Sequence, residues 1–249
     1  MSYPLLIIFA LAPSTIWLLY FLRKDVHPES NRMVLKIFFY GILAAVGAIL
    51  LELGFFLTTA ELPFSSILIS FLNVFIGVAL IEEFLKFLVV KEKILSNSEL
   101  DEPVDIMLYM IIAALGFVAL ENILIFLSPK IFLLGLGETL ILVVFRFISA
   151  TLLHALTSGI LGYFLALSFF EIKKRVKFLV IGITLATLFH GLYNLSFTNP
   201  DLIYHYFGNI IKVEVLRFSI PTIILIALAI LVSLGFKRLK KIASICKIK

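Results

Sequence analysis

The chain has 249 residues, of which 62% are hydrophobic and only 15% are charged, and its formal net charge is +5. A soluble domain has close to half apolar residues, so this composition excludes that class and favours a protein that crosses the membrane several times. The basic residues stand in short clusters between apolar runs, which is typical of membrane topology signals. We therefore expect a lipid bilayer around the chain and no nucleic-acid partner.

Seven apolar runs are long enough for a helix to cross a hydrocarbon core of about 30 Å, which takes roughly 20 residues. The first run has no basic segment before it and continues to Leu22, so we expect a retained helix and no cleaved signal peptide. The fifth run is too long for one untilted crossing, and residues 131–137 are a candidate for a separate interfacial piece. The predicted fold is all-α, a polytopic transmembrane bundle of about seven helices, with eight as the alternative. The predicted spans are 4–22, 34–57, 66–90, 104–127, 140–170, 178–198 and 218–236.

Lysine and arginine are concentrated in alternate loops, namely those after the first, third and fifth predicted helices, and in the C-terminal tail. The positive-inside rule then predicts an N-terminus outside the cell membrane and a cytoplasmic C-terminus. No repeat and no soluble domain is evident. We predict one integral membrane domain, residues 1–249, with a motif-bearing core at 66–198.

Ionisable and amide side chains inside the predicted spans are few, and they fall on four successive helices. An ionisable residue at a helix centre costs roughly 2.5–3.5 kcal/mol on an insertion scale, so such residues are candidate functional sites by default. The third helix carries two glutamates and a lysine, the fourth a Glu-Asn pair, the fifth an arginine and a histidine, and the sixth a histidine and an asparagine. These residues are Glu82, Glu83, Lys86, Glu121, Asn122, Arg146, His154, His190 and Asn194.

Helical spacing groups these side chains further. Glu82 and Glu83 lie four and three residues before Lys86, so the lysine can neutralise one carboxylate and leave the other as a general base. His190 and Asn194 are four residues apart and face the same neighbour. Glutamates with two imidazoles can activate water directly or through a divalent cation.

These motifs resemble the PrsW-type intramembrane proteases, within the wider CAAX-protease and bacteriocin-processing superfamily. The motifs are EEFLK, a Glu-Asn pair on the next helix, R-x7-H and H-x3-N, in the family's order over residues 82–194. The resemblance implies an intramembrane endopeptidase that cleaves a membrane-associated protein or peptide. It implies the following catalytic roles: Glu82 as base, Glu83 as its partner, His154 and His190 as imidazoles, and Asn194 as oxyanion donor.

The remaining motif residues, Lys86, Glu121, Asn122 and Arg146, are assigned supporting roles. The CAAX-processing branch of the superfamily prefers phenylalanine four residues before the second-motif histidine. Ala150 stands at that position here, and Arg146 has the PrsW-type spacing, which argues against prenyl-protein processing.

Several alternatives remain open at the level of sequence. The buried charges also suit a proton- or ion-coupled transporter, a non-catalytic superfamily member that binds membrane proteins, or a structural ion network. Glu121 and Arg146 lie toward helix ends, where a structural salt bridge or a snorkelling arginine is at least as good an interpretation. Glu52 in the second helix is assigned to the scaffold.

Metal dependence is the last open question. A catalytic zinc takes three protein ligands, and His154, His190, Glu82 and Glu83 are the candidates. The Lys86 ammonium beside the glutamates would repel a divalent ion, so we expect a metal-free glutamate base and no cofactor, with zinc as the alternative. The single cysteine, Cys246, excludes a disulfide within one chain.

Overall fold

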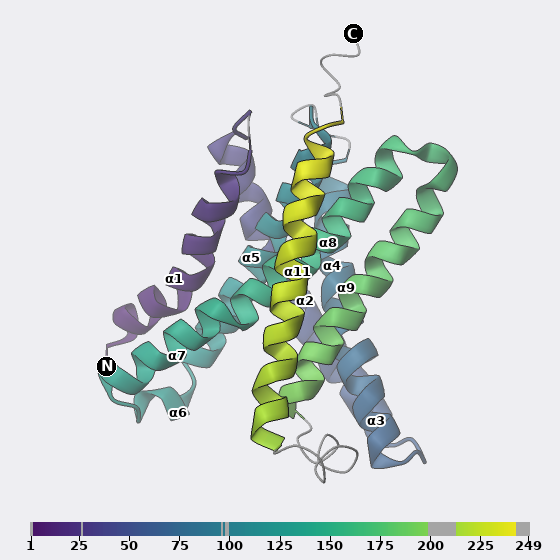
Figure 1. Cartoon of the computed structure of the whole chain (residues 1–249). Helices are drawn as coiled ribbons and strands as arrows, with labels where there is room; N and C mark the ends of the chain where they lie inside the picture. Colours follow the sequence, from purple (N-terminus) through teal and green to yellow (C-terminus); the bar gives the residue numbers. More distant parts are fainter. Residues whose placement is uncertain (1, 26, 96, 98–99, 199–212, 243–249) are drawn as a thin grey trace.

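The computed structural model describes the chain except for residues 1, 26, 96, 98–99, 199–212 and 243–249, and the described part contains helices and no β-strand (Figure 1). Long apolar segments form helices in a membrane because a helix satisfies every backbone hydrogen bond internally. In chain order the elements are α1 (Tyr3–Leu22), α2 (Asn31–Ala60), α3 (Ser66–Leu72), the π-helix η1 (Asn73–Leu80), α4 (Ile81–Lys93), α5 (Pro103–Phe126), α6 (Pro129–Phe132), α7 (Leu136–Ile148), α8 (Ala150–Phe170), the 3-10 turn η2 (Ile172–Lys174), α9 (Arg175–Thr198) and α11 (Val213–Leu239).

Seven helical segments in the described part of the chain are long and apolar enough to cross a membrane. This confirms the predicted all-α bundle and the count of seven. The segments are Tyr3–Leu22, Asn31–Ala60, Ser66–Lys93, Pro103–Phe126, Leu136–Phe170, Ile172–Phe197 and Arg217–Leu239. The alternative of an eighth span is wrong for the described residues, because α6 has only 4 residues and Leu136 already belongs to the fifth segment.

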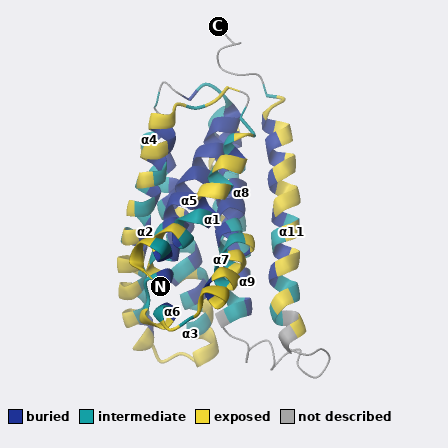
Figure 2. Ribbon diagram, turned by 90° about the vertical axis from the view of Figure 1, so that its left-hand side faces the viewer, coloured by how far each residue is buried: buried dark blue, intermediate teal, exposed yellow. Residues whose placement is uncertain are grey.

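α5 lies at the centre of the bundle, where Figure 2 shows the buried residues gathered. It packs against α1, α2 and α8. Gly41 of α2 and Gly116 of α5 allow α2 and α5 to cross closely, since a Cβ atom on either would overlap backbone atoms of the facing helix. Such close approach at small residues is the usual way that membrane helices gain packing energy. It fixes α5, and with it Glu121 and Asn122, against α2.

The third span changes its helical winding just before the glutamate pair. Residues Asn73–Leu80 form a π-helix between α3 and α4, and it ends two residues before Glu82. A π-helix carries more residues per turn than an α-helix, so it rotates every later side chain about the axis. The Thr59 hydroxyl donates a hydrogen bond of 2.7 Å to Asn73 Oδ1 at the start of this segment. The π segment therefore determines which neighbours the glutamates face.

The fifth span is broken, where the sequence predicted one long tilted or protruding helix. α7 ends at Ile148, and Ser149 leaves the helical region with φ −116° and ψ −96° before α8 begins. The Trp17 indole of α1 donates a hydrogen bond of 2.8 Å to the Phe147 carbonyl oxygen, and so satisfies one backbone group near the break. The break separates Arg146 on α7 from His154 on α8.

Candidate active site

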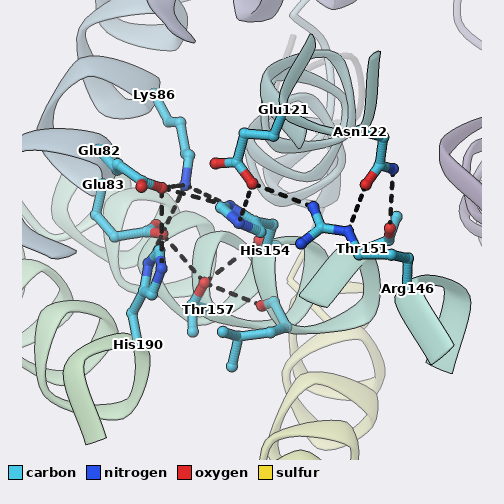
Figure 3. A network of polar contacts seen from close by, with 11 residues as sticks. Glu82, Glu83, Lys86, Glu121, Asn122, Arg146, Thr151, His154, Thr157 and His190 are labelled. Carbon is cyan, nitrogen blue, oxygen red and sulfur yellow. Dashed lines mark hydrogen bonds and ion pairs between the residues drawn. The ribbon is translucent and has the colours of Figure 1, made fainter. Parts of the chain in front are cut away.

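The ammonium group of Lys86 lies at the centre of the polar cluster. Its Nζ donates to Glu82 Oε2 at 3.2 Å, to Glu83 Oε1 at 3.0 Å and to His154 Nδ1 at 2.8 Å (Figure 3). A lysine ammonium has three donors, so these contacts use all of them. Nζ also lies 4.3 Å from the centroid of the Phe117 ring, a cation–π contact. The Lys86 and Glu83 side chains are completely buried, and that of Glu82 is 7% exposed.

These contacts determine the tautomer of His154. Because Lys86 can only donate, Nδ1 of His154 accepts, and the ring proton belongs on Nε2. Nε2 lies 3.4 Å from Glu121 Oε2, which is an acceptor for that proton. His154 is therefore held between a donor on α4 and an acceptor on α5.

Both oxygens of the Glu83 carboxylate are occupied by donors. Oε1 accepts from Lys86, from His190 Nδ1 at 3.0 Å and from the Thr157 hydroxyl at 3.1 Å. Oε2 accepts from the Ser158 hydroxyl at 2.7 Å. With four donors around it, Glu83 is set up to stay ionised and to hold α4, α8 and α9 together.

Thr157 and Ser158 were not identified by sequence reasoning. They lie three and four residues after His154 on α8, so helical spacing places them on the same face as that histidine. Hydroxyl residues are common in membrane helices, and the spacing alone does not reveal a partner on another helix. Both side chains are buried.

Glu82 has a more open environment. Its Oε2 lies 3.6 Å from His154 Nδ1 and 3.8 Å from His190 Nε2, and the two imidazole rings meet edge to face with centroids 4.9 Å apart. Glu82 also lines a cavity of about 270 Å³ between α2, α4 and α5, together with Glu52 and Glu121. The remaining wall of this cavity is apolar: Ala45, Ala48, Ile49, Phe117, Leu124 and Ile125.

The cavity reaches the outside of the bundle, since Ile49 and Leu124 in its wall are 42% and 51% exposed. Glu52, which sequence reasoning assigned to the scaffold, belongs to this wall. Its spacing from Ala45, Ala48 and Ile49 places it on the same face of α2. Only the packing of α2 against α4 and α5 reveals that this face meets Glu82.

A second layer of polar residues surrounds Glu121. Arg146 donates from Nη2 to Glu121 Oε2 at 3.3 Å and from Nε to Asn122 Oδ1 at 2.6 Å (Figure 3). Asn122 in turn donates to the Thr151 hydroxyl at 3.3 Å. The Arg146 side chain is 13% exposed, so it points into the bundle and does not snorkel toward the membrane surface. The salt bridge between Glu121 and Arg146, which the sequence allowed as an alternative, is formed. Glu121 also contacts His154 and so connects this salt bridge to the cluster around Lys86.

Eight of the nine predicted site residues thus belong to one connected network of hydrogen bonds and ion pairs. Asn194 lies on α9 one helical turn beyond His190 and is half-buried. Its backbone position places its side chain on the same face as His190.

One donor set in the network suits a metal ion. Single ligand atoms of Glu82, His154 and His190 lie within 4.8 Å of one another. A zinc ion bound at about 2.0–2.1 Å keeps tetrahedral ligands about 3.3 Å apart, close to the 3.6 and 3.8 Å found from Glu82 to the two rings. The residues present therefore fit a catalytic His₂Glu site. Lys86 competes for it, because its ammonium already contacts Glu82 Oε2 and His154 Nδ1.

Comparison with known proteins agrees with the motif pattern. The family model described as "PrsW family intramembrane metalloprotease" matches residues 29–237. Protease PrsW of Geobacillus kaustophilus is 32% identical over 184 residues, which cover 74% of this chain and 75% of that protein. Protease PrsW of Bacillus subtilis is 31% identical over 193 residues, 76% and 80% of the two chains. No solved structure matches this chain.

Replacing Lys86 tests whether its ammonium holds the cluster together. Lys86→Met keeps the apolar stem and leaves Glu82 and Glu83 without their shared counter-charge. We expect the free energy of unfolding to fall by about 3–5 kcal/mol, as when one partner of a buried ion pair is removed. Chemical denaturation of the purified chain in detergent micelles measures this change. Lys91→Met, which alters a half-exposed side chain on the same helix, is the control and should leave stability unchanged. Equal stability of the two variants would contradict a central role for Lys86.

Proposed function

Because the chain belongs to the PrsW family of intramembrane proteases, we propose that it hydrolyses a peptide bond of a membrane-associated protein, with Glu82 as the base that activates water. The described residues form seven helices that are long and apolar enough to cross a membrane, which makes the chain an integral membrane protein. The observation that carries the assignment is that Glu82 lies between two imidazoles and also lines a cavity open to the bundle surface. Family membership favours proteolysis over ion-coupled transport.

Glu82 is preferred to Glu83 because the two carboxylates have different surroundings. Four donors surround Glu83, and a carboxylate stabilised in this way is a weak base. Among the described residues, Glu82 accepts a hydrogen bond from Lys86 alone, and the cavity of about 270 Å³ beside it has room for water. Glu83 acts in this scheme as a positioning residue for His190 and Lys86.

The proposed reaction proceeds by general base catalysis. Glu82 takes a proton from a water molecule as the water oxygen forms a bond to the carbonyl carbon of the substrate. The carbonyl oxygen then carries a negative charge, which the Asn194 amide and a neighbouring imidazole stabilise by hydrogen bonding. The proton passes from Glu82 to the leaving amine, through His190 Nε2 or directly, as the C–N bond breaks. Glu83, which accepts from His190 Nδ1, stabilises any positive charge that His190 gains.

Exchange of each glutamate for glutamine separates the two roles. Glu82→Gln keeps the shape of the side chain and removes the base, so we expect a folded, membrane-inserted protein with cleavage reduced at least ~10²-fold. Glu83→Gln places an amide among groups that all donate, so we expect a loss of stability as well as of activity. The readout is the set of new N-termini in membrane proteins of cells that express each variant, with thermal unfolding in detergent measured in parallel. Wild-type cleavage by Glu82→Gln would contradict the assignment.

We further propose that the base works without a metal. The support is Lys86, whose ammonium donates to the same two atoms, Glu82 Oε2 and His154 Nδ1, that a cation would need. If a divalent cation binds, Glu82, His154 and His190 would hold it, and it would supply Lewis-acid polarisation of water or of the substrate carbonyl. In either case Glu83, Thr157 and Ser158 orient His190 and α8.

Purification in a strong chelator distinguishes these mechanisms. We expect the chelated protein to keep its activity and to contain less than stoichiometric zinc by elemental analysis. Activity that is lost with a bound stoichiometric metal, and restored when zinc is added back, would refute the metal-free base and leave the protease assignment intact.

The proposed orientation has the N-terminus outside and the C-terminus in the cytoplasm. It rests on the lysines and arginines of the loops after α1, after α4 and between α8 and α9, and these loops lie at the same end of the bundle as the C-terminal end of α11 (Figure 1). The only cysteine, Cys246 in the C-terminal tail, offers a direct test. A membrane-impermeant maleimide should label Cys246 in inside-out membrane vesicles and not in right-side-out vesicles. The opposite pattern would reverse the orientation.

A further inference from the structure

A groove of about 260 Å³ lies between α1 and α11, and Leu152 and Leu156 of α8 also line it. None of its lining residues belongs to the network around Lys86. Its apolar surface is largely aromatic, with Trp17, Phe21 and Phe236 as the main side chains. The Phe21 and Phe236 rings stack across the groove with centroids 6.3 Å apart, and both are buried. This surface is complementary to a hydrocarbon chain.

One end of the groove is basic. Lys24 follows the last turn of α1, Lys237 lies in the last turn of α11, and Lys240 comes directly after that helix. Lys24 Nζ lies 4.6 Å from the centroid of the Tyr20 ring, so its stem is drawn along the groove wall. Among the described residues, none of the three lysines has a salt bridge to a carboxylate. Within the part of the chain that the structure describes, three cations therefore share one end of the groove without an ion pair to a carboxylate.

The distance between the aromatic part and the basic end of the groove matches that between the acyl chain and the headgroup of a lipid that lies parallel to the helices. Trp17 and Lys24 are seven residues apart, which is about 10 Å along a helix. A lipid with its phosphate among the lysines would therefore place the upper part of an acyl chain against Trp17. Basic pockets between membrane helices at one membrane face commonly hold anionic lipid headgroups.

We propose that this groove binds one anionic phospholipid, with its phosphate among Lys24, Lys237 and Lys240 and an acyl chain along Trp17, Phe21 and Phe236. A headgroup with a net negative charge is preferred to a zwitterionic one, because the three ammonium groups attract the negative charge. In a zwitterionic lipid they would also repel the positively charged choline. An apolar helix from a partner protein would fill the aromatic part of the groove and leave the lysines unpaired.

The bound lipid would contact the helix that carries His154. Leu152 and Leu156, two residues before and two after His154, line the groove. Residues two positions apart lie on nearly opposite sides of a helix, so α8 has the histidine on one face and the lipid on the other. The lipid therefore supports α8 from behind the candidate active site.

Trp17, which lines the groove, is the only tryptophan of the protein, so its fluorescence reports on a lipid bound there. The full chain is reconstituted in phosphatidylcholine bilayers that contain a small fraction of lipid brominated in the upper acyl chain. We expect brominated phosphatidylglycerol to quench Trp17 with a relative affinity at least about 5-fold above that of brominated phosphatidylcholine, the effect of one lysine near an anionic headgroup.

Two sets of substitutions make the test specific. Lys24→Gln, Lys237→Gln and Lys240→Gln together should abolish the preference for phosphatidylglycerol. Lys36→Gln, Lys173→Gln and Lys177→Gln together remove the same charge from exposed positions outside the groove and should leave the preference intact. The readout needs no substrate, so it succeeds or fails independently of the proposed protease activity.

Four results would overturn the proposal. The first is equal quenching by the two brominated lipids, and the second is equal loss of preference in the two triple variants. The third is competition by inorganic phosphate at constant ionic strength, which would indicate a free-anion site. The fourth is relief of quenching as the protein-to-lipid ratio rises, which would indicate that a second copy of the chain covers the groove.

Discussion

The charge of Lys86 is the interaction on which the rest of this site depends. Two neighbouring carboxylates inside a membrane repel each other strongly, because little solvent screens them. Lys86 lies within hydrogen-bonding distance of both and of His154, and Glu83 extends the same cluster to His190. One ammonium group thus connects α4 directly to α8 and indirectly to α9. Without it, the carboxylates would have to be neutralised or the helices would separate.

The two adjacent glutamates have different roles because of helix geometry. Successive residues on a helix point about 100° apart, so the two glutamates meet different helices even though both contact Lys86. Glu83 faces α8 and α9, where the hydroxyls of Thr157 and Ser158 and the ring of His190 occupy its oxygens. Glu82 faces α2 and α5 and meets the cavity that also contains Glu52 and Glu121. The π-helix that precedes α4 sets this rotation, so the division of roles depends on backbone geometry as much as on side-chain identity.

Around this centre, each helix of the core has a separate task. α5 is held by close crossings and carries Glu121 and Asn122, which position Arg146 and reach His154. The break at Ser149 divides the fifth span into one part that supplies Arg146 and another that supplies His154. α8 carries the histidine on one face and contributes to the α1–α11 groove on the other, so the proposed lipid site and the proposed active site share a helix.

The sequence by itself determined the all-α membrane fold, the seven spans and the residues of the polar cluster. It could do so because burying an ionisable side chain in lipid is costly, so such residues stand out against an apolar background. Only the tertiary structure decided how the cluster is connected: the hydroxyls bound to Glu83, the inward position of Arg146, the break at Ser149 and the place of Glu52 in the cavity wall. Serine, threonine and a lone glutamate occur in many membrane helices for structural reasons. Their roles depend on which helix packs opposite, and spacing along one helix cannot specify that neighbour.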